Sequence, residues 1–497
     1  MKKFNIYFTA GLVSLVATTS CKKLELNPAN QIAITQAFQS VKDAQSWDTG
    51  MYGTFRARQN GIYTYFSDVQ ADQLNASLDF GNRNGSPHRW LDFQADDQTV
   101  PTMWAGYYGA LANINQAIAG FKTITPNGAA ETAALNQYTG DMYLARAFYY
   151  HKLVTRWAKP YETATAATDP GVPLILTFDI TLLPPRASVK AVYDQILADI
   201  AQAKTLLASV PGAQGSKIFT IDVATALEAR VKLYMHDNAG AYAAAQSLIA
   251  SNKYPLITTA AALQTYWYND GVQESIYQSA ASLTELPPAM ALYLTYKTGN
   301  SAYDPDFIPT QGIYDLYPVG DIRKTTYFSV VPVQIVTTKV TIPLVNKYPG
   351  NPALYTGAFS SSNYVNAPKV FRIGEMYCIA AEAAAAQGAG GEPNALIALN
   401  ALRTARGEGV IAAAGVALTQ AIRDERTREL AFEGFRLDDI SRWHIGFTRL
   451  TPQNTSIIYT GPTYNLQTQP ADAPKLEWPI PTNDITVNKN LVQNPGY

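Results

Sequence analysis

The stretch VATALEARVKLYMHDNAGAYAAAQSLIA, residues 223–250, decides the fold class. Apolar and alanine residues recur at three- and four-residue spacing up to His236, and Asp237 and Asn238 interrupt the pattern before a second helical run, Ala241 to Ala250. Alanine-rich seams let helix backbones approach closely, as in stacked repeat helices. The stretch therefore predicts a pair of helices joined by a turn, and it favours a tetratricopeptide-like scaffold without a strict repeat period.

The same spacing predicts further helices along the chain, so the expected fold class is all-α. These helices are predicted at 41–55, 102–121, 141–157, 188–207, 371–387, 393–406 and 417–432.

Two regions lack helical periodicity. Residues 60–100 are rich in Gly, Asn, Asp and Ser, which predicts mostly loop, and residues 266–367 form a long loop-rich insert. The insert contains one predicted strand pair, 329–335 with 337–344, in which β-branched residues dominate.

Helical pairs are expected on both sides of the insert, within about 35–265 and 368–450. This interleaving predicts a single domain over 21–497 that ends in an extended segment, 451–497, rather than the roughly three domains that the length alone suggests.

The N-terminus has the layout of an export signal. Lys2 and Lys3 precede an apolar run from Ile6 to Ala17, which is too short to cross a bilayer core of about 30 Å. The run ends at Thr18-Thr19-Ser20-Cys21, which resembles the signals of bacterial lipoproteins, whose cysteine becomes the acylated first residue. We therefore expect a signal peptide over 1–20 and lipidation of Cys21.

Composition excludes several classes of function. Lys and Arg number 38 and Asp and Glu number 39, so no overall positive charge favours nucleic acid as a partner. The four histidines are scattered, and no paired-cysteine motif is present, so we expect no metal and no cofactor. After Cys21 the only cysteine is Cys378, which lies among alanines and is expected to be a buried thiol without a disulfide partner.

A family resemblance emerges in the last third. The run IRDERTRELAFEGFR at 422–436, NALRTARG at 400–407, WPIP at 478–481 and the ending QNPGY at 493–497 resemble SusD/RagB lipoproteins, as does ARAFYY at 145–150. The resemblance implies a lipid-anchored protein on the cell-surface side of the outer membrane that binds oligosaccharides and delivers them to a SusC-like TonB-dependent transporter. It implies binding, not catalysis.

The charged run within this signature has a structural interpretation. Glu425 with Arg428, Arg426 with Glu429, and Glu433 with Arg436 are each three residues apart, a spacing at which helical side chains pair. We predict a salt-bridged helix surface.

The irregular regions carry the groups that a sugar requires, because a sugar offers an apolar face to aromatic rings and hydroxyls to polar groups. The foremost candidates are Trp90 and Tyr296, and the predicted glycan-binding set is completed by Tyr63, Tyr65, Asn82, Arg83, Trp267 and Tyr303. His88, Tyr266, Tyr293 and Asp306 belong to the same two regions.

Alternatives from other classes remain open. A surface glycoside hydrolase needs two carboxylates across a cleft, for which Asp68 or Asp72 with Asp96 or Asp97 are the loop candidates. Asp68, Asp72 and Asp79 also suggest calcium, although a solvated loop fits their spacing better. The third class is a scaffold, or a receptor for peptides, siderophores or another non-glycan nutrient.

Overall fold

The computed structural model describes residues 36–355 and 362–497. The predicted signal peptide and Cys21 lie outside these residues.

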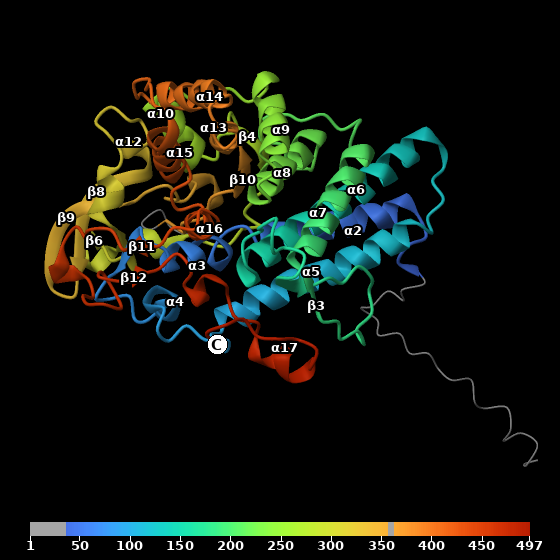
Figure 1. The fold of residues 1–497 in the computed structure, drawn as a ribbon, viewed down its shortest axis with the longest axis horizontal. Helices are drawn as coiled ribbons and strands as arrows, with labels where there is room; N and C mark the ends of the chain where they lie inside the picture. The colour runs from blue at the N-terminus through green and yellow to red at the C-terminus, as the bar shows by residue number, and fades with distance from the viewer. Residues whose placement is uncertain (1–35, 356–361) are drawn as a thin grey trace, which may run out of the picture.

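Four long helices pack side by side at one end of the molecule (Figure 1, right). They are α2 (Val41–Arg56), α5 (Thr99–Phe121), α6 (Gly128–Trp157) and α7 (Val189–Leu206). Ser40 and Asp43 begin α2 with a reciprocal capping box, and the Ser188 hydroxyl caps α7 by accepting from Ala191 N at 3.2 Å. The four predicted helices are confirmed, and α6 begins well before the predicted residue 141.

The pair predicted from residues 223–250 is present as α8 (Ile221–Tyr234) and α9 (Asn238–Ala250). Beyond the insert, α13 (Ile373–Ala385) packs against α9, and α14 (Glu392–Ala405) and α15 (Gly415–Glu429) follow. Ala241, Ala245, Ala380 and Ala384 are almost fully buried, so small side chains do allow these helices to pack closely.

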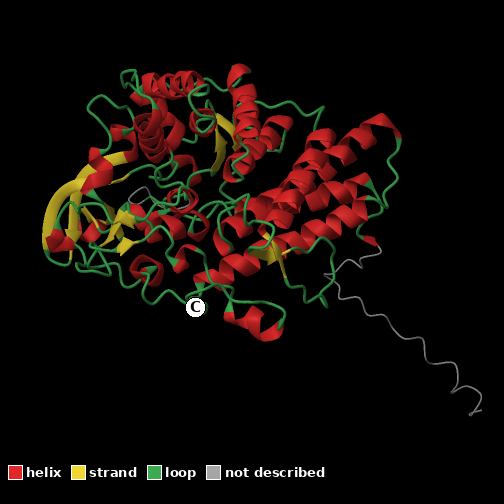
Figure 2. Cartoon of the chain, viewed as in Figure 1, coloured by secondary structure: helices red, strands yellow, loops and turns green. Residues whose placement is uncertain are grey.

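Short strands accompany the helices, so the fold is mostly helical rather than all-α (Figure 2). The predicted strand pair is confirmed as β8 (Phe328–Ile335) and β9 (Thr338–Val345), which extend a four-stranded sheet of order β5-β6-β8-β9. Four two-stranded sheets are β1 (Leu74–Ala76) with β7 (Phe307–Pro309), β2 (Pro170–Pro173) with β3 (Arg186–Ser188), β4 (Ser275–Gln278) with β10 (Lys369–Arg372), and β11 (Phe447–Thr448) with β12 (Thr468–Gln469).

Just over half of residues 60–100 is turn and loop, as predicted, but the region also contains regular elements. They include α3 (Ile62–Gln70), β1 and α4 (Gly85–Arg89). The sequence did not reveal α3 because the helix is short and its buried face includes Thr64, Ser67, Asp68 and Gln70, which hide its apolar periodicity.

The remaining short helices connect these parts. They are α10 (Ala260–Tyr268), α11 (Gln311–Asp315), α12 (Lys324–Tyr327), α16 (Arg436–Arg442) and α17 (Thr482–Val487).

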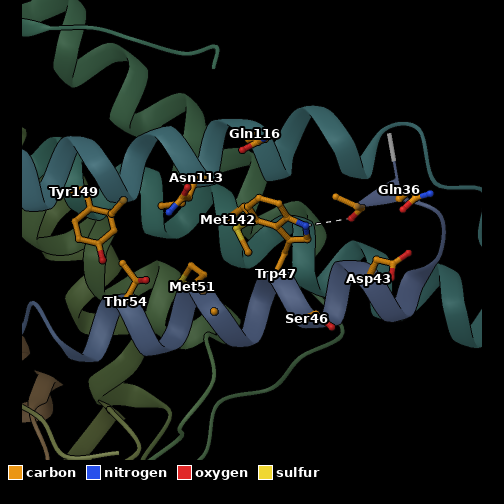
Figure 3. Close-up of a pocket in the computed structure, with 14 residues that line it drawn as sticks. Gln36, Asp43, Ser46, Trp47, Met51, Thr54, Asn113, Gln116, Met142 and Tyr149 are labelled. Carbon is orange, nitrogen blue, oxygen red and sulfur yellow. Dashed lines mark hydrogen bonds between the residues drawn. The ribbon is translucent and has the colours of Figure 1, made fainter. Parts of the chain in front are cut away.

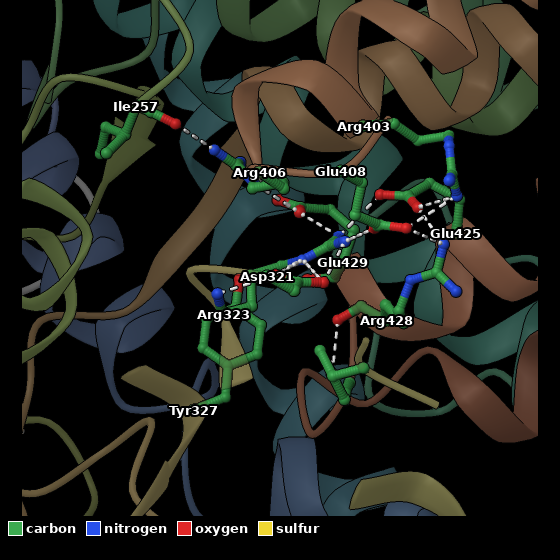
Figure 4. Close-up of polar contacts among 12 residues, drawn as sticks. Ile257, Asp321, Arg323, Tyr327, Arg403, Arg406, Glu408, Glu425, Arg428 and Glu429 are labelled. Carbon is green, nitrogen blue, oxygen red and sulfur yellow. Dashed lines mark hydrogen bonds and ion pairs between the residues drawn. The ribbon is translucent and has the colours of Figure 1, made fainter. Parts of the chain in front are cut away.

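Most of the charged residues of α15 are buried, and they do not form the exposed, salt-bridged helix surface that the sequence predicted. Glu425, Arg426 and Glu429 are almost fully buried. Glu429 accepts from Arg323 and Arg406 at 2.9–3.0 Å (Figure 4), and from Arg372 at 2.8 Å. Burial raises the pKa of Glu429, but Arg406 and Arg372 outweigh it and hold that pKa well below its usual value. Arginines from other elements therefore compensate the carboxylates.

Two of the three predicted pairs within the run do not form. Arg426 donates to Asp439, and Arg436 donates to Asp72 at 2.6 and 2.9 Å. Glu433 binds Lys347 and Arg372. Only Glu425 with Arg428 pairs as expected.

The largest apolar core contains residues from Phe38 to Leu491, from both sides of the insert. Cys378 on α13 is buried as predicted, and burial raises the pKa of its thiol. Among the described residues, no helix combines the length and apolar character needed to span a bilayer.

Candidate functional site

A short strand pairing joins the two irregular regions. Strand β1 pairs antiparallel with β7 in the register Asn75 to Ile308, and Ser77 N donates to the Asp306 carbonyl at 2.9 Å. The segment that follows β1 is thereby held beside the segment that precedes β7. Candidate binding residues more than 200 positions apart in the sequence, Arg83 and Asp306, are thus in contact.

The turn after β1 presents Arg83. Gly81, Asn82 and Asn84 have φ values of 58°, 60° and 56°, a conformation that glycine and asparagine adopt most readily. Arg83 stands between the two asparagines, and 59% of its side chain is exposed.

Arg83 and Asp306 form a bidentate pair. Arg83 Nε donates to Asp306 Oδ2 at 2.7 Å, and Nη2 donates to Oδ1. The hydrogen bonds from Arg83 to Asp306 raise the pKa of the guanidinium. A planar fork of this kind fixes both groups and leaves further donor and acceptor positions for a ligand.

These residues line a hollow of about 400 Å³, which we call the Arg83 pocket. Its charged members are two cations, Arg83 and Lys297, and two carboxylates, Asp304 and Asp306, so the charges balance. Burial, and then Asp79, raise the pKa of Asp304. The other lining residues are Tyr65, Asn84, Ala289, Ala291, Leu292 and Thr295.

Tyr65 forms an aromatic wall of this pocket. It projects from α3 and is half-buried, and burial followed by the Asp306 charge raises the pKa of its hydroxyl. The predicted residues Tyr65 and Arg83 are thus brought together.

A small hairpin forms the adjoining edge. Strands β5 (Tyr296–Lys297) and β6 (Ala302–Tyr303) pair so that Tyr296 faces Tyr303, with ring centroids 5.1 Å apart at an edge-on angle of 66°. Both rings are half-buried. They are sequence neighbours of the lining residues Lys297 and Asp304, but they do not line the pocket themselves.

Trp90 and Trp267, which were predicted to stack against a sugar, belong to the core instead, and this corrects the prediction. Trp90 is 3% exposed, and its indole N–H donates to the Gln70 carbonyl at 2.8 Å. Trp267 is 1% exposed and packs against Tyr327 and Tyr348. Neither indole lines the Arg83 pocket, and His88, Tyr266 and Tyr293 are buried too.

Two other predicted residues lie outside the Arg83 pocket. Tyr63 packs against Tyr107 and borders a separate polar cavity. Asn82 is exposed, and its amide oxygen accepts from Arg89 Nη1 at 2.5 Å, so it shapes the turn that carries Arg83.

An aromatic pair on the C-terminal segment was missed from the sequence. The rings of Tyr459 and Tyr464 stack with centroids 5.0 Å apart, and Tyr459 N donates to the Ala76 carbonyl beside the same turn. Tyr459 is 37% exposed. Tyr459 and Tyr464 flank Gly461 and Pro462. This turn signal is the feature of the sequence that could have indicated that the two rings lie close together.

Asp68, Asp72 and Asp97, three of the aspartates suggested for calcium or hydrolysis, are already engaged. Asp68 is buried and accepts from Gly434 N at 3.0 Å, while Asp72 pairs with Arg436. Asp97 accepts from the Ser86 hydroxyl and from Thr99 N. Within the described residues, no group of three or more His, Cys, Asp or Glu side chains is arranged to hold a metal ion.

A larger hollow of about 570 Å³ lies elsewhere, between α2, α5 and α6 (Figure 3). Trp47 is the one indole among its lining residues. The Trp47 ring stacks on Phe38 with centroids 5.0 Å apart, and its indole N–H donates to the Ala37 carbonyl at 3.2 Å. Met51, Ile114 and Met142 give it an apolar wall, and the sequence did not point to it. It lacks the exposed guanidinium and paired carboxylates of the Arg83 pocket.

The fold and the pocket together define a class of protein in which a helical scaffold carries a binding pocket on irregular segments. Family comparisons agree with this class. Residues 258–497 match the model of the SusD family, and residues 24–233 match a model described as starch-binding associating with outer membrane. The chain is a SusD-like protein.

Curated relatives come from Formosa agariphila. SusD-like protein P38 is 28% identical over 289 residues, which cover 55% of this chain and 51% of that relative. SusD-like protein P2 is 25% identical over an alignment of 552 positions, which covers 100% of both chains. This chain thus matches about half the length of P38 and the full length of P2.

Solved structures share the fold. A SusD superfamily protein from Bacteroides thetaiotaomicron has a TM-score of 0.78 at 22% identity, covering 92% of this chain and 100% of that one. A laminarin-binding SusD-like protein has a TM-score of 0.69 at 19% identity, covering 93% and 100%.

Proposed function

We propose that this protein captures neutral oligosaccharides at the Arg83 pocket. The observation that carries the proposal is the balanced set of two cations and two carboxylates around a hollow of about 400 Å³. Such a set offers donors and acceptors to hydroxyl groups without favouring a charged ligand. Tyr65 supplies an aromatic wall for the apolar face of a sugar ring.

The adjoining tyrosines extend the proposed surface. Tyr296 and Tyr303 on the hairpin and Tyr459 on the C-terminal segment are partly exposed rings near the same turn and strand edge. We assign them to the outer sugar units of an oligosaccharide, and Arg83, Asp304 and Asp306 to the unit in the pocket.

Family membership supports a proposal about the biological role. We propose that residues 21–497 form one domain on tetratricopeptide-like helix pairs, anchored at the outer membrane through acylated Cys21 and exposed at the cell surface. The domain hands its ligand to a SusC-like TonB-dependent transporter. The description of the matched family model, associating with outer membrane, supports the location.

Direct titration tests the binding proposal. Laminarihexaose, maltohexaose, cellohexaose and xylohexaose are titrated calorimetrically into the full chain and into Arg83→Ala and Tyr65→Ala. Binding of at least one oligosaccharide that weakens in both variants supports the proposal. An unmodified chain that binds none of them, but binds a peptide or a siderophore, points to the non-glycan receptor class.

A hydrolase is the second candidate, because the pocket holds two carboxylates and the pKa of Asp304 is raised, as a general acid requires. Chromatography of the oligosaccharides after long incubation separates the two functions. Intact chains support binding alone, and shortening that disappears in Asp304→Asn and Asp306→Asn identifies a hydrolase.

A further inference from the structure

A polar cavity of about 50 Å³ lies away from the Arg83 pocket, where the end of α2 meets α6, α8 and β10. It is lined by four cationic side chains, Arg58, Lys152, Arg230 and Lys369, but by one carboxylate, Glu433. Arg58 and Lys152 are half-buried. The imbalance is notable because charges withdrawn from water are normally compensated.

The single carboxylate is already occupied. Glu433 accepts from Lys347 Nζ at 2.6 Å and from Arg372 at 2.6 and 2.9 Å. Arg230 forms a bidentate pair with Glu375, and Lys369 pairs with Asp270 at 3.1 Å. Glu433 therefore has little capacity left for the other two cations, Arg58 and Lys152.

Lys152 forms neither a hydrogen bond nor an ion pair with any residue in 36–355 and 362–497. Its ammonium lies over the rings of Phe148 and Phe435, at 5.7 and 6.0 Å from their centroids. Burial, and then the Arg230 charge, lower the pKa of Lys152 to about 8. The carboxylates that act on it electrostatically, Asp438 and Glu375, are paired with Arg156 and Arg230.

Arg58 completes the donor set. Its Nε and Nη1 donate to the carbonyls of Gly106 and Thr54, at 2.7 and 2.9 Å, and it pairs with no carboxylate in the described part of the chain. Tyr63 lies beside it at the cavity, and the Arg58 charge acts on the Tyr63 hydroxyl. An ammonium, a guanidinium and a hydroxyl thus border one small void.

We propose that this cavity binds a small oxyanion, either a carboxylate or a tetrahedral anion such as sulfate or phosphate, with Lys152 and Arg58 as its cationic ligands. A void of about 50 Å³ has room for only a few water molecules, so the ligand is a small ion rather than a sugar. The site is separate from the proposed glycan pocket and does not depend on it.

Calorimetric titration and thermal unfolding of the full chain test the proposal. Sodium acetate, sulfate and phosphate are added at constant ionic strength against sodium chloride. We expect at least one of the three to bind with a stoichiometry of one and to raise the unfolding temperature. Binding of acetate alone identifies a site for carboxylates, and binding of sulfate or phosphate identifies a site for tetrahedral anions.

Lys152→Met keeps the length of the side chain and removes its charge, and it should weaken anion binding about tenfold or more. Lys339 is an exposed residue of β9, so Lys339→Met is the matched control and should bind the anion as the unmodified chain does. Side-chain NMR of labelled lysines gives an independent readout, because the bound anion should raise the pKa of Lys152. If no anion binds, or if Lys152→Met binds as well as Lys339→Met, the cavity holds only water and the proposal is wrong.

Discussion

Arg83 and Asp306 are 223 positions apart in the chain, yet Arg83 Nε donates to Asp306 Oδ2 at 2.7 Å. The pairing of β1 with β7 holds them together, because Ser77 N also donates to the Asp306 carbonyl. The pair couples the two irregular regions at a pocket that combines balanced charge with an aromatic wall.

Arg83→Ala should weaken binding of the best oligosaccharide about tenfold or more, because hydrogen bonds from a charged group are among the stronger ligand contacts. Stability should change by about 1 kcal/mol or less, since the arginine is exposed. Calorimetric titration and urea unfolding measure the two quantities. Lys190→Ala, in an exposed pair with Asp194 on α7, is the control and should alter neither. Unchanged affinity in Arg83→Ala places the glycan elsewhere.

Trp90 should act on stability rather than directly on the ligand. Trp90→Ala removes a buried ring that packs on Phe447 and should lower the free energy of unfolding by about 3–5 kcal/mol. Trp90→Phe keeps a ring but leaves the Gln70 carbonyl without the indole N–H, which should cost about 1–3 kcal/mol. Urea unfolding measures both. A Trp90→Phe protein with unchanged stability and weakened glycan binding would restore this residue to the binding site.

Glu429→Gln should destabilise the fold strongly, by about 3–5 kcal/mol, because three buried arginines lose a shared negative charge. Denaturant unfolding with circular dichroism detection gives the free energy. Asp194→Asn changes a carboxylate in the same way but breaks only an exposed pair on α7, and its cost should be about 0.5 kcal/mol or less. Equal costs for the two variants would mean that the buried network contributes no more than a surface pair.

Local signals explain what the sequence predicted well. The α8–α9 pair and the β8–β9 hairpin each depend on residues within about one element's length, where periodicity and turn residues are informative. The buried charges were misread because spacing along α15 reveals Glu425 and Glu429 but not the arginines at 323, 372 and 406 that cover them.

The site was predicted in part for the same reason. Tyr65 and Arg83 were chosen by residue type in an irregular segment, and the structure places both at the pocket. Trp90 met the same criterion, but Phe447 and Gln70 decide its burial, and Phe447 lies more than 350 residues away. Long-range packing, not composition, separates a binding ring from a core ring.

Cys21→Ala should release the protein from membranes, because acyl chains provide the proposed attachment and two or more chains are needed for stable anchoring. Fractionation of cells that express the unmodified chain or the variant, followed by immunoblotting, measures the distribution. Ser20→Ala retains the cysteine and serves as the control. A Cys21→Ala protein that remains in the membrane fraction contradicts the tether.

The buried pair of Asp48 on α2 and Asp141 on α6 should make stability depend on pH. Burial raises the pKa of Asp48 from 3.8 to about 7, although a hydrogen bond with Asp141 partly offsets the rise. Because the folded state holds this proton more tightly than the unfolded state, the contribution is fully present below about pH 4. It is lost progressively as the pH rises towards 7.

Asp48→Asn removes that ionisation, so the variant should gain stability relative to the unmodified chain as the pH rises. The difference between the two proteins should grow by a few kcal/mol, about 4 at most, between pH 4 and pH 8. Urea unfolding at one-unit pH steps measures it, and the exposed Asp194→Asn serves as the matched control. A constant difference across this range would show that Asp48 is already ionised in the folded protein at low pH.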